Sequence, residues 1–186
     1  MKKIILASQS PRRKQLLEWA EVPFEIVVVP TDENYPATIS VEEVPVFIAR
    51  NKALAVKEKV SEYAVVLAAD TIVVLNNRII GKPTDKDDAI AILSALSGQK
   101  HKVITGVVIK EREKEIAFSD ITEVQFHSLT AEQIIFYVDK YKPYDKAGAY
   151  AIQEWIGVTG IQSISGDFYN VMGLPVSRVV QALAAL

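Results

Sequence analysis

Short apolar runs and longer amphipathic stretches follow one another along the 186-residue chain. The run Lys3–Ala7 is brief and rich in isoleucine, which predicts a buried strand. Similar runs predict strands over Phe24–Val29, Ala64–Ala69, Ile72–Leu75, Arg78–Ile80, Lys102–Lys110 and Glu115–Phe126, with irregular strands continuing to Ile164. Because strands and helices mix without regular alternation, the pattern favours a mixed α/β sheet flanked by helices over a strict array of βαβ units.

Helix start and stop signals occupy the stretches between these strands. Ser10 and Pro11 predict the cap and first position of a helix that ends near Trp19. The capping-box pattern, a hydroxyl residue followed three positions later by Glu or Gln, occurs at Ser40–Glu43 and Thr130–Gln133. The remaining signals are a cap at Thr84 for a helix to Leu96, a stop at Gly98, a last helix from Pro175, and turns at Asn76-Asn77 and Gly166-Asp167.

Composition excludes several classes of protein. The net charge of −2 gives no global field that would draw the chain to nucleic acid or to an anionic membrane, so any phosphate must be held by local geometry. The absence of cysteine excludes a disulfide scaffold, a thiolate zinc site and a cysteine nucleophile. No apolar stretch approaches the ~20 residues needed to span a bilayer, and the start does not resemble a signal peptide. We therefore expect a cytoplasmic protein without membrane or nucleic-acid partners.

The segment Ser8-Gln9-Ser10-Pro11-Arg12-Arg13 places two hydroxyls and two guanidinium groups where a strand turns into a helix. Helix N-termini present unpaired N–H groups and a positive dipole end, which together attract anions. Cations are poorly placed there, so a bound phosphate would resolve a local conflict. The alternative is a Ser-Pro cap with surface arginines.

A carboxylate and two lysines lie beside apolar runs. Asp70 stands between two predicted strands, where burial is costly unless the carboxylate is paired, hydrogen-bonded or bound to metal. The alternative is an aspartate that caps a turn at the sheet edge. Lys52 borders the apolar stripe of its predicted helix, where it either reaches a site or snorkels to solvent. Lys82 precedes a proline after the predicted hairpin and is a rigidly presented cation.

Other catalytic patterns are missing from the sequence. His101 and His127 lack the spacing of an imidazole metal site, so a working metal would need oxygen ligands such as Asp70 and Glu33, which implies Mg²⁺ or Mn²⁺. No G-x-S-x-G elbow, Walker A pattern or G-x-G-x-x-G fingerprint occurs, which removes the main support for serine-hydrolase, kinase-like and dinucleotide-binding functions. Gln153 follows a stretch of small residues, and its amide can read a base edge.

An ordered set of segments resembles the Maf family, and the similarity runs almost from end to end. The segments are Ser8-Gln9-Ser10-Pro11-Arg12-Arg13, Ala49-Arg50-Asn51-Lys52-Ala53, Ala69-Asp70-Thr71, Gly81-Lys82-Pro83, Ser97-Gly98, Thr105-Gly106-Val107, Asp145-Lys146-Ala147-Gly148-Ala149-Tyr150, Ile152-Gln153 and Gly173-Leu174-Pro175. Each segment is short, but the ordered set is highly specific.

The resemblance implies a single Maf-like domain over residues 1–186, with a fold like that of inosine triphosphate pyrophosphatases. That fold has an elongated mixed sheet and two lobes with a central cleft. The implied reaction is hydrolysis of nucleoside triphosphates to the monophosphate and pyrophosphate, with a divalent cation, Mg²⁺ or Mn²⁺. By the family pattern Asp70 is the catalytic carboxylate, and Glu33 helps it to hold the metal. The residues expected to bind the phosphates are Ser8, Ser10, Arg13, Lys52 and Lys82.

Three further positions bear on the base. Arg12, Thr71 and Gln153 look like those of the subgroup that acts on dTTP and UTP, whereas the 7-methyl-GTP subgroup would show a tryptophan, a glutamine and a glutamate there. Glu154-Trp155 follows Gln153, where many relatives have glycine. The alternatives are a different base preference, such as 7-methyl-GTP, or a nucleotide-binding regulator of cell division without turnover. The family also implies a possible homodimer.

Overall fold

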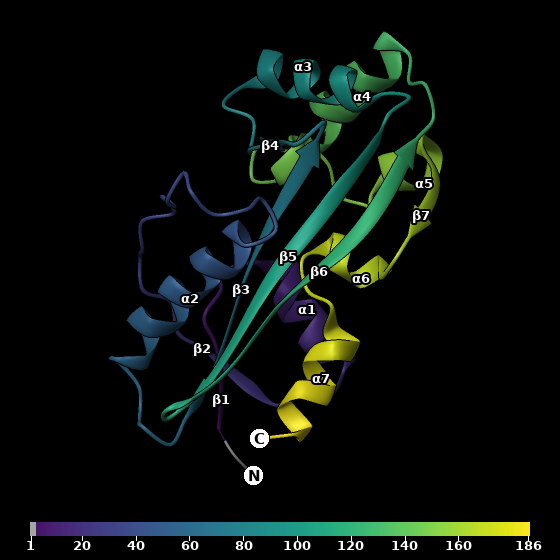
Figure 1. Cartoon of the computed structure of the whole chain (residues 1–186). Coiled ribbons are helices and arrows are strands. Elements are labelled where there is room, and N and C mark those ends of the chain that lie inside the picture. Colours follow the sequence, from purple (N-terminus) through teal and green to yellow (C-terminus); the bar gives the residue numbers. More distant parts are fainter. Residues whose placement is uncertain (1–2) are drawn as a thin grey trace. The chain divides into compact units, whose positions relative to one another are not determined.

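A mixed sheet runs through the computed structural model, which describes residues 3–186 (Figure 1). Over these residues the sheet has seven strands: six follow the order β2-β1-β3-β5-β6-β7, and the seventh, β4, pairs with β3 off this path. The strands are β1 Ile4–Leu6, β2 Phe24–Ile26, β3 Val65–Leu75, β4 Arg78–Ile80, β5 Lys100–Glu111, β6 Lys114–Phe126 and β7 Ile161–Ser165. Parallel and antiparallel pairs both occur, so the mixed α/β fold predicted from the sequence is confirmed.

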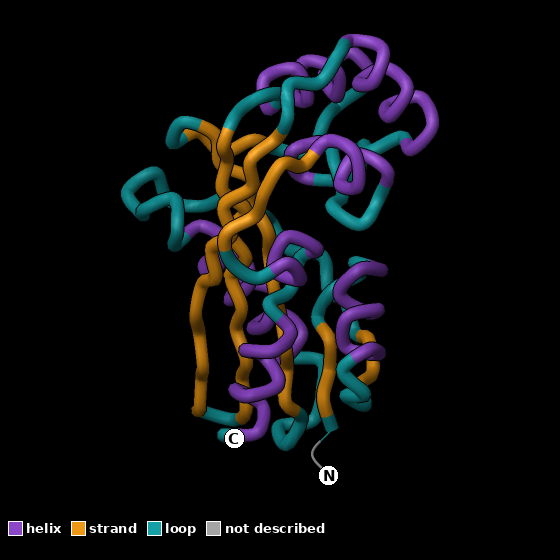
Figure 2. Tube along the Cα trace, turned by 90° about the vertical axis from the view of Figure 1, so that its right-hand side faces the viewer, coloured by secondary structure: helices purple, strands orange, loops and turns teal. Residues whose placement is uncertain are grey.

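The chain forms two compact units. The first holds the described residues up to Thr71 together with Thr105–Asp120 and Gly173–Leu186, and the second holds Ile72–Ile104 and Ile121–Met172. The long strands β3, β5 and β6 contribute residues to both units, and β5 and β6 are neighbours joined by a tight turn (Figures 1 and 2). The single domain with a central cleft implied by the resemblance stays a prediction.

In the first unit β1 pairs in parallel with β2 and with β3. Its helices are α1 Pro11–Trp19, α2 Val44–Lys57 and α7 Val176–Ala184. Helix α2 packs on the sheet through small residues, Ala49 and Ala53, against Val66 and Ala68 of β3. Because side chains of a strand alternate between its two faces, Asp70 lies on the α2 side of β3, and Thr71 lies on the other side.

The second unit is built around an antiparallel hairpin and a helical layer. Asn76 and Asn77 both have positive φ, at 49° and 62°, as a two-residue turn of the predicted kind requires. The helices are α3 Lys86–Leu96, α4 Ala131–Tyr141, the 3₁₀ turn η1 Ala147–Ala149, α5 Trp155–Gly160 and α6 Phe168–Met172. None of the helices in residues 3–186 combines the length and apolarity that a bilayer-spanning segment needs.

Two of the predicted helix starts are confirmed in detail. The Ser10 side chain caps α1 by accepting from the Arg13 backbone N–H, with proline in the first turn as predicted. Thr130 and Gln133 form a complete capping box at α4.

Several other expectations were wrong. Helix α2 begins at Val44, not at Ser40: the Glu43 carboxylate accepts from the Ser40 N–H and hydroxyl, but this pair closes a turn ahead of the helix. Pro45 explains the delay, because proline is tolerated in a first turn and not further inside a helix. The cap of α3 is Asp85 and not Thr84.

Strand ends and the chain's tail also differ from the expectation. Strand β2 is short, ending at Ile26 rather than Val29. Asp70 does not end a strand, since β3 continues through it to Leu75. The tail contains the short helices α5 and α6 in place of some of the irregular strands, because these few-residue turns carry no apolar period long enough to read.

Candidate active site

The turn from β1 into α1 fixes the backbone of the Ser8–Arg13 segment. Ser10 Oγ accepts from the Arg13 N–H at 3.4 Å, and the Ser10 N–H donates to Ser8 Oγ at 3.2 Å. Pro11 opens the helix, where its missing N–H costs nothing. The result is a rigid corner with both serine hydroxyls on it. From this corner the Arg13 side chain is buried, with 9% of the residue exposed.

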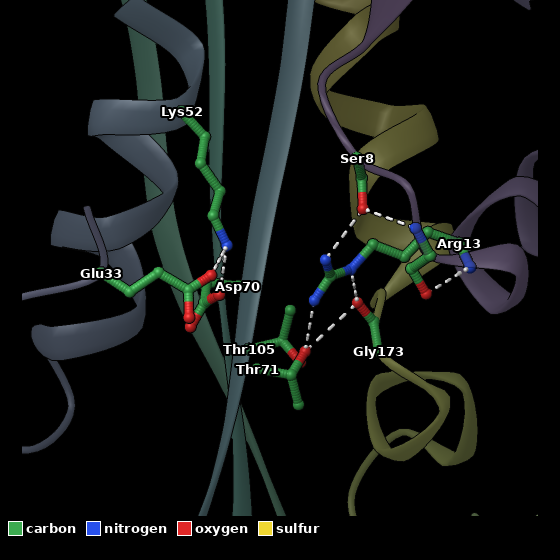
Figure 3. A network of polar contacts seen from close by, with 9 residues as sticks. Ser8, Arg13, Glu33, Lys52, Asp70, Thr71, Thr105 and Gly173 are labelled. Carbon is green, nitrogen blue, oxygen red and sulfur yellow. Dashed lines mark hydrogen bonds and ion pairs between the residues drawn. The ribbon is translucent and has the colours of Figure 1, made fainter. Parts of the chain in front are cut away.

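Neutral groups hold the Arg13 guanidinium on three sides (Figure 3). Its Nε donates to the Gly173 carbonyl at 2.7 Å, Nη1 donates to Ser8 Oγ at 3.1 Å, and Nη2 donates to Thr71 Oγ1 at 2.9 Å. A guanidinium carries five N–H bonds, so these contacts leave two for another acceptor. Ser8 is itself buried, at 7% exposure, so the orientation of the group is determined inside the protein.

No carboxylate within residues 3–186 forms an ion pair with Arg13. Burial lowers the pKa of Arg13, the charge of Asp70 opposes that change, Arg12 adds to it, and Glu33 again opposes it. A buried charge is expensive unless an opposite charge or metal accompanies it. An anion that accepts the remaining N–H bonds would supply the missing charge, so the chemistry of this group suits a phosphate or carboxylate ligand.

On the α2 side of β3 three charged groups converge (Figure 3). Lys52 Nζ lies 2.7 Å from Asp70 Oδ1 and 2.7 Å from Glu33 Oε1. The side chains of Lys52 and Asp70 are 19% and 13% exposed, whereas that of Glu33 is 54% exposed. Lys52 therefore reaches the carboxylate 18 positions away rather than snorkelling to solvent, and Glu33 joins the pair from the loop after β2.

Strand β3 separates this carboxylate cluster from the arginine cluster, since Asp70 and Thr71 are consecutive residues with opposite facing (Figure 3). The parallel pairing of β1 with β3 ends at Leu67. Asp70 and Thr71 thus lie beyond the end of β1, where that neighbour no longer covers the strand. Function at the carboxyl end of a parallel strand is the usual arrangement in open α/β sheets.

Two contributors to the arginine cluster were not identified from the sequence. Thr105 of β5 is completely buried, and its Oγ1 lies 2.9 Å from Thr71 Oγ1. The Gly173 carbonyl accepts from Arg13 and, at 3.4 Å, from Thr71. Both residues occur in the segments that resemble the Maf family, but a threonine inside an apolar strand and a main-chain carbonyl have no local sequence signal of their own.

Three predicted residues remain, Arg12, Lys82 and Gln153. Arg12 lies in the first turn of α1 and is half-buried. Lys82 and Gln153 are exposed residues of the second unit. Gln153 lies in a turn closed by the hydrogen bond from the Glu154 N–H to the Ala151 carbonyl at 3.1 Å. The structure thus joins Ser8, Ser10, Arg13 and Thr71 in one cluster, and Glu33, Lys52 and Asp70 in the other.

The Glu154 carboxylate anchors the turn that carries Gln153. The buried Tyr137 hydroxyl donates to Glu154 Oε2 and accepts from the Ala151 N–H at 3.2 Å. Lys146 Nζ lies 3.7 Å from Glu154 Oε1. Glu154 is therefore part of the support for this turn.

Glu33 and Asp70 are the residues suited to hold a divalent cation. Both present carboxylate oxygens to one cation-sized position, which the Lys52 ammonium fills. Oxygen donors suit Mg²⁺ and Mn²⁺. Across residues 3–186 no group of three or more His, Cys, Asp or Glu side chains is placed to hold a metal, so the remaining ligands would be water and substrate oxygens.

Comparisons with known proteins identify the family and the fold. A curated protein of Parabacteroides distasonis named dTTP/UTP pyrophosphatase is 49% identical over 182 residues, covering 97% of this chain and 94% of the relative. A protein of Cytophaga hutchinsonii with the same name is 50% identical over 180 residues, covering 97% and 82%. The solved Ham1 protein of Staphylococcus aureus shares the fold, with a TM-score of 0.55 at 16% identity over 99% of this chain and 98% of that one. The family model for Maf-like protein matches residues 3–186, and the chain therefore belongs to the Maf family.

Proposed function

We propose that this protein hydrolyses nucleoside triphosphates, with dTTP and UTP preferred, to the monophosphate and pyrophosphate. The observation that carries the proposal is the buried Arg13 of α1, whose guanidinium has neutral hydrogen-bond partners and two further N–H bonds. One of those partners, Thr71, directly follows Asp70 of the acidic cluster along β3. Relatives that share about half of its residues over nearly its whole length bear the name dTTP/UTP pyrophosphatase, which supports the choice of substrate.

The triphosphate is bound by cations and hydroxyls. Arg13 donates to phosphate oxygens while Ser8, Thr71 and Gly173 hold its guanidinium in place. The Ser10 hydroxyl adds a donor, and the N-terminus of α1 adds the positive end of the helix dipole. Lys52 and Lys82 supply further positive charge, which offsets the negative charge of the triphosphate tail.

The reaction transfers the α-phosphoryl group to water. A water oxygen bonds to the α-phosphorus, the bond from that phosphorus to the α,β-bridging oxygen breaks, and the pyrophosphate leaves with the bond's electron pair. Asp70 accepts the proton of the attacking water. Arg13 and the lysines stabilise the charge that develops on the leaving group.

Glu33 and Asp70 would hold the divalent cation, Mg²⁺ or Mn²⁺. When bound, such an ion polarises a phosphoryl oxygen and lowers the pKa of a nearby water. Arg12, Thr71 and Gln153 set the preference for a pyrimidine base, with the Gln153 amide suited to the neutral edge of uracil or thymine because it both donates and accepts hydrogen bonds.

The test measures pyrophosphate release from a panel of nucleoside triphosphates with Mg²⁺ or Mn²⁺. We expect release from dTTP and UTP, and a loss of about 10²–10⁴-fold in kcat for Asp70→Asn with an unchanged far-ultraviolet circular dichroism spectrum. Asp87→Asn, on the exposed first turn of α3, is the control. Full dTTP hydrolysis by Asp70→Asn would show that Asp70 is not the general base. Release from purine nucleotides alone would change the substrate, and no release from any nucleotide would favour the regulator.

A further inference from the structure

Thr105 completes the buried network around Arg13 without being placed to touch a substrate. The residue is fully buried in β5, and its Oγ1 lies 2.9 Å from Thr71 Oγ1. The Thr71 hydroxyl joins Thr105 to the arginine, because its Oγ1 bonds to Thr105 Oγ1 and accepts from Arg13 Nη2. A hydroxyl at zero exposure behind two other polar groups acts through those groups.

The bond to Thr105 orients the Thr71 hydroxyl. The Thr71 hydroxyl accepts from Arg13 Nη2, so it has a single proton left to donate. Thr105 Oγ1 is the nearer partner, at 2.9 Å, and either hydroxyl can donate in that bond, whereas the Gly173 carbonyl at 3.4 Å can only accept. Because threonine has few χ1 rotamers, this hydrogen bond fixes the direction in which the Thr71 lone pair faces the guanidinium.

Gly173 holds the opposite part of the same group. Its carbonyl accepts from Arg13 Nε at 2.7 Å, the shortest of the three contacts to the side chain. Its φ of +118° lies in the region that favours glycine, and an added Cβ would meet nothing closer than Arg13 Nε at 3.6 Å. Backbone conformation rather than space therefore requires glycine here. Two contacts at separate nitrogens determine the plane of the guanidinium.

We propose that Thr105 and the Gly173 carbonyl are positioning groups, which set the plane of the Arg13 guanidinium for the phosphate tail. On this proposal Thr71 contributes to phosphate binding through Arg13, because its hydroxyl accepts from Arg13 Nη2. The proposal rests on the proposed function, since it takes Arg13 as a phosphate-binding residue.

The test is a double-mutant cycle between Thr105→Val and Arg13→Lys, read by calorimetric binding of inorganic tripolyphosphate and by kcat and KM for dTTP. Loss of one buried hydrogen bond predicts about tenfold weaker tripolyphosphate binding and a comparable rise in KM for Thr105→Val. Thr105→Ser, which keeps the hydroxyl, should stay within about twofold of wild type. In the Arg13→Lys background Thr105→Val should have no further effect, because lysine lacks the planar group that is being oriented.

Thr122→Val is the matched control. Thr122 is an equally buried threonine of β6 whose hydroxyl donates to the Asp167 carbonyl, away from Arg13. Its removal should lower the melting temperature and leave tripolyphosphate binding unchanged. If Thr105→Val is too unstable to purify, Thr105→Ala takes its place in the same cycle.

The outcomes separate this proposal from the proposed function. Equal losses from Thr105→Val in both backgrounds, or failure of Thr105→Ser to restore binding, would show a merely structural threonine and overturn the positioning role. A wild-type protein that neither binds tripolyphosphate nor hydrolyses dTTP would overturn the function itself. If the wild-type protein binds tripolyphosphate and hydrolyses dTTP, but the effects of Thr105→Val and Arg13→Lys simply add, the proposed function stands and Thr105 has no positioning role.

Discussion

Lys52 places its ammonium nitrogen 2.7 Å from Asp70 Oδ1, and the same nitrogen lies 2.7 Å from Glu33 Oε1. The lysine thus occupies the position where the two carboxylates would share a divalent cation. An ammonium and a metal ion cannot both fill it. When a nucleotide is present, its phosphates offer the lysine another partner, so nucleotide binding and metal binding should favour each other at this cluster.

Replacing Lys52 by methionine should therefore strengthen metal binding in the absence of nucleotide. We expect Mn²⁺ to bind Lys52→Met about tenfold more tightly than wild type or better, since close charge pairs couple by about 1.5 kcal/mol or more. Electron paramagnetic resonance titration of free Mn²⁺ measures this directly. Lys59→Met, an exposed residue just after α2, should bind as wild type does. Unchanged or weaker Mn²⁺ binding to Lys52→Met would contradict the shared position.

The turn at Gln153 should lose its discrimination when its anchor is weakened. In Glu154→Gln the side chain keeps its size but loses the charge that faces Tyr137 and Lys146. We expect the ratio of kcat/KM for UTP over CTP to fall about threefold to tenfold, because a less rigid turn presents the amide less consistently. Initial rates on both nucleotides provide the ratio. Glu132→Gln, on the exposed first turn of α4, is the control, and an equal loss on both nucleotides would assign Glu154 a purely structural role.

Acid should destabilise the protein partly through His101. Burial lowers the pKa of this histidine from 6.5 to about 4, its Nε2 lies 2.7 Å from the Tyr150 hydroxyl, and its Nδ1 has no partner among the described residues. The unfolded chain therefore binds a proton that the folded protein does not, and stability falls as the pH drops from about 6.5 to about 4. The contribution amounts to at most about 3 kcal/mol.

Urea unfolding at several pH values tests the histidine. His101→Gln should show a shallower loss of stability between pH 6.5 and 4 than wild type, whereas His127→Gln, at an exposed position, should keep the wild-type slope. Identical slopes for wild type and His101→Gln would show that other groups cause the acid sensitivity.

A methyl group at Gly106 should disturb the contact between α2 and β5. A Cβ built there would lie 2.2 Å from the Val46 nitrogen and 2.3 Å from the Pro45 carbonyl carbon, both rigid backbone atoms. We expect Gly106→Ala to lower the free energy of unfolding by about 3 kcal/mol or more. Gly81→Ala, where a Cβ meets nothing within 4 Å, should change it by less than about 0.5 kcal/mol. Denaturant titrations compare the two, and equal values would contradict the close packing.

Local chemistry made the arginine corner predictable. Ser10 and Pro11 specify a helix start with contacts that span only three residues, so the cap and the start of α1 agree with the sequence. The unfavourable position of arginines in a first helical turn indicated an anion site, and the structure adds that Arg13 is buried among neutral acceptors. The sequence could not supply those acceptors, because Thr71, Thr105 and Gly173 come from distant parts of the chain.

Tertiary contacts account for the expectations that failed. The charge of Asp70 led to the prediction that the strand ends there. In the structure Lys52 balances the negative charge of this carboxylate, and β3 continues through Asp70. The capping-box pattern at Ser40 and Glu43 formed its side-chain contacts without a helix behind them, since Pro45 sets the first turn later. The relation of Lys82 and Gln153 to the clusters depends on packing between distant segments, which no local pattern encodes.

Because side chains alternate along β3, a single peptide bond, between Asp70 and Thr71, separates the carboxylate cluster from the arginine cluster. Sliding a strand by a single residue exchanges its two faces, and here that would present threonine to the lysine and aspartate to the arginine. The parallel pairing of Ile4 with Val65 through Leu6 with Leu67 prevents this exchange. The three residue pairs between β1 and β3 thus keep the carboxylate and the arginine on their own faces, and a redesign of this enzyme would have to preserve that pairing.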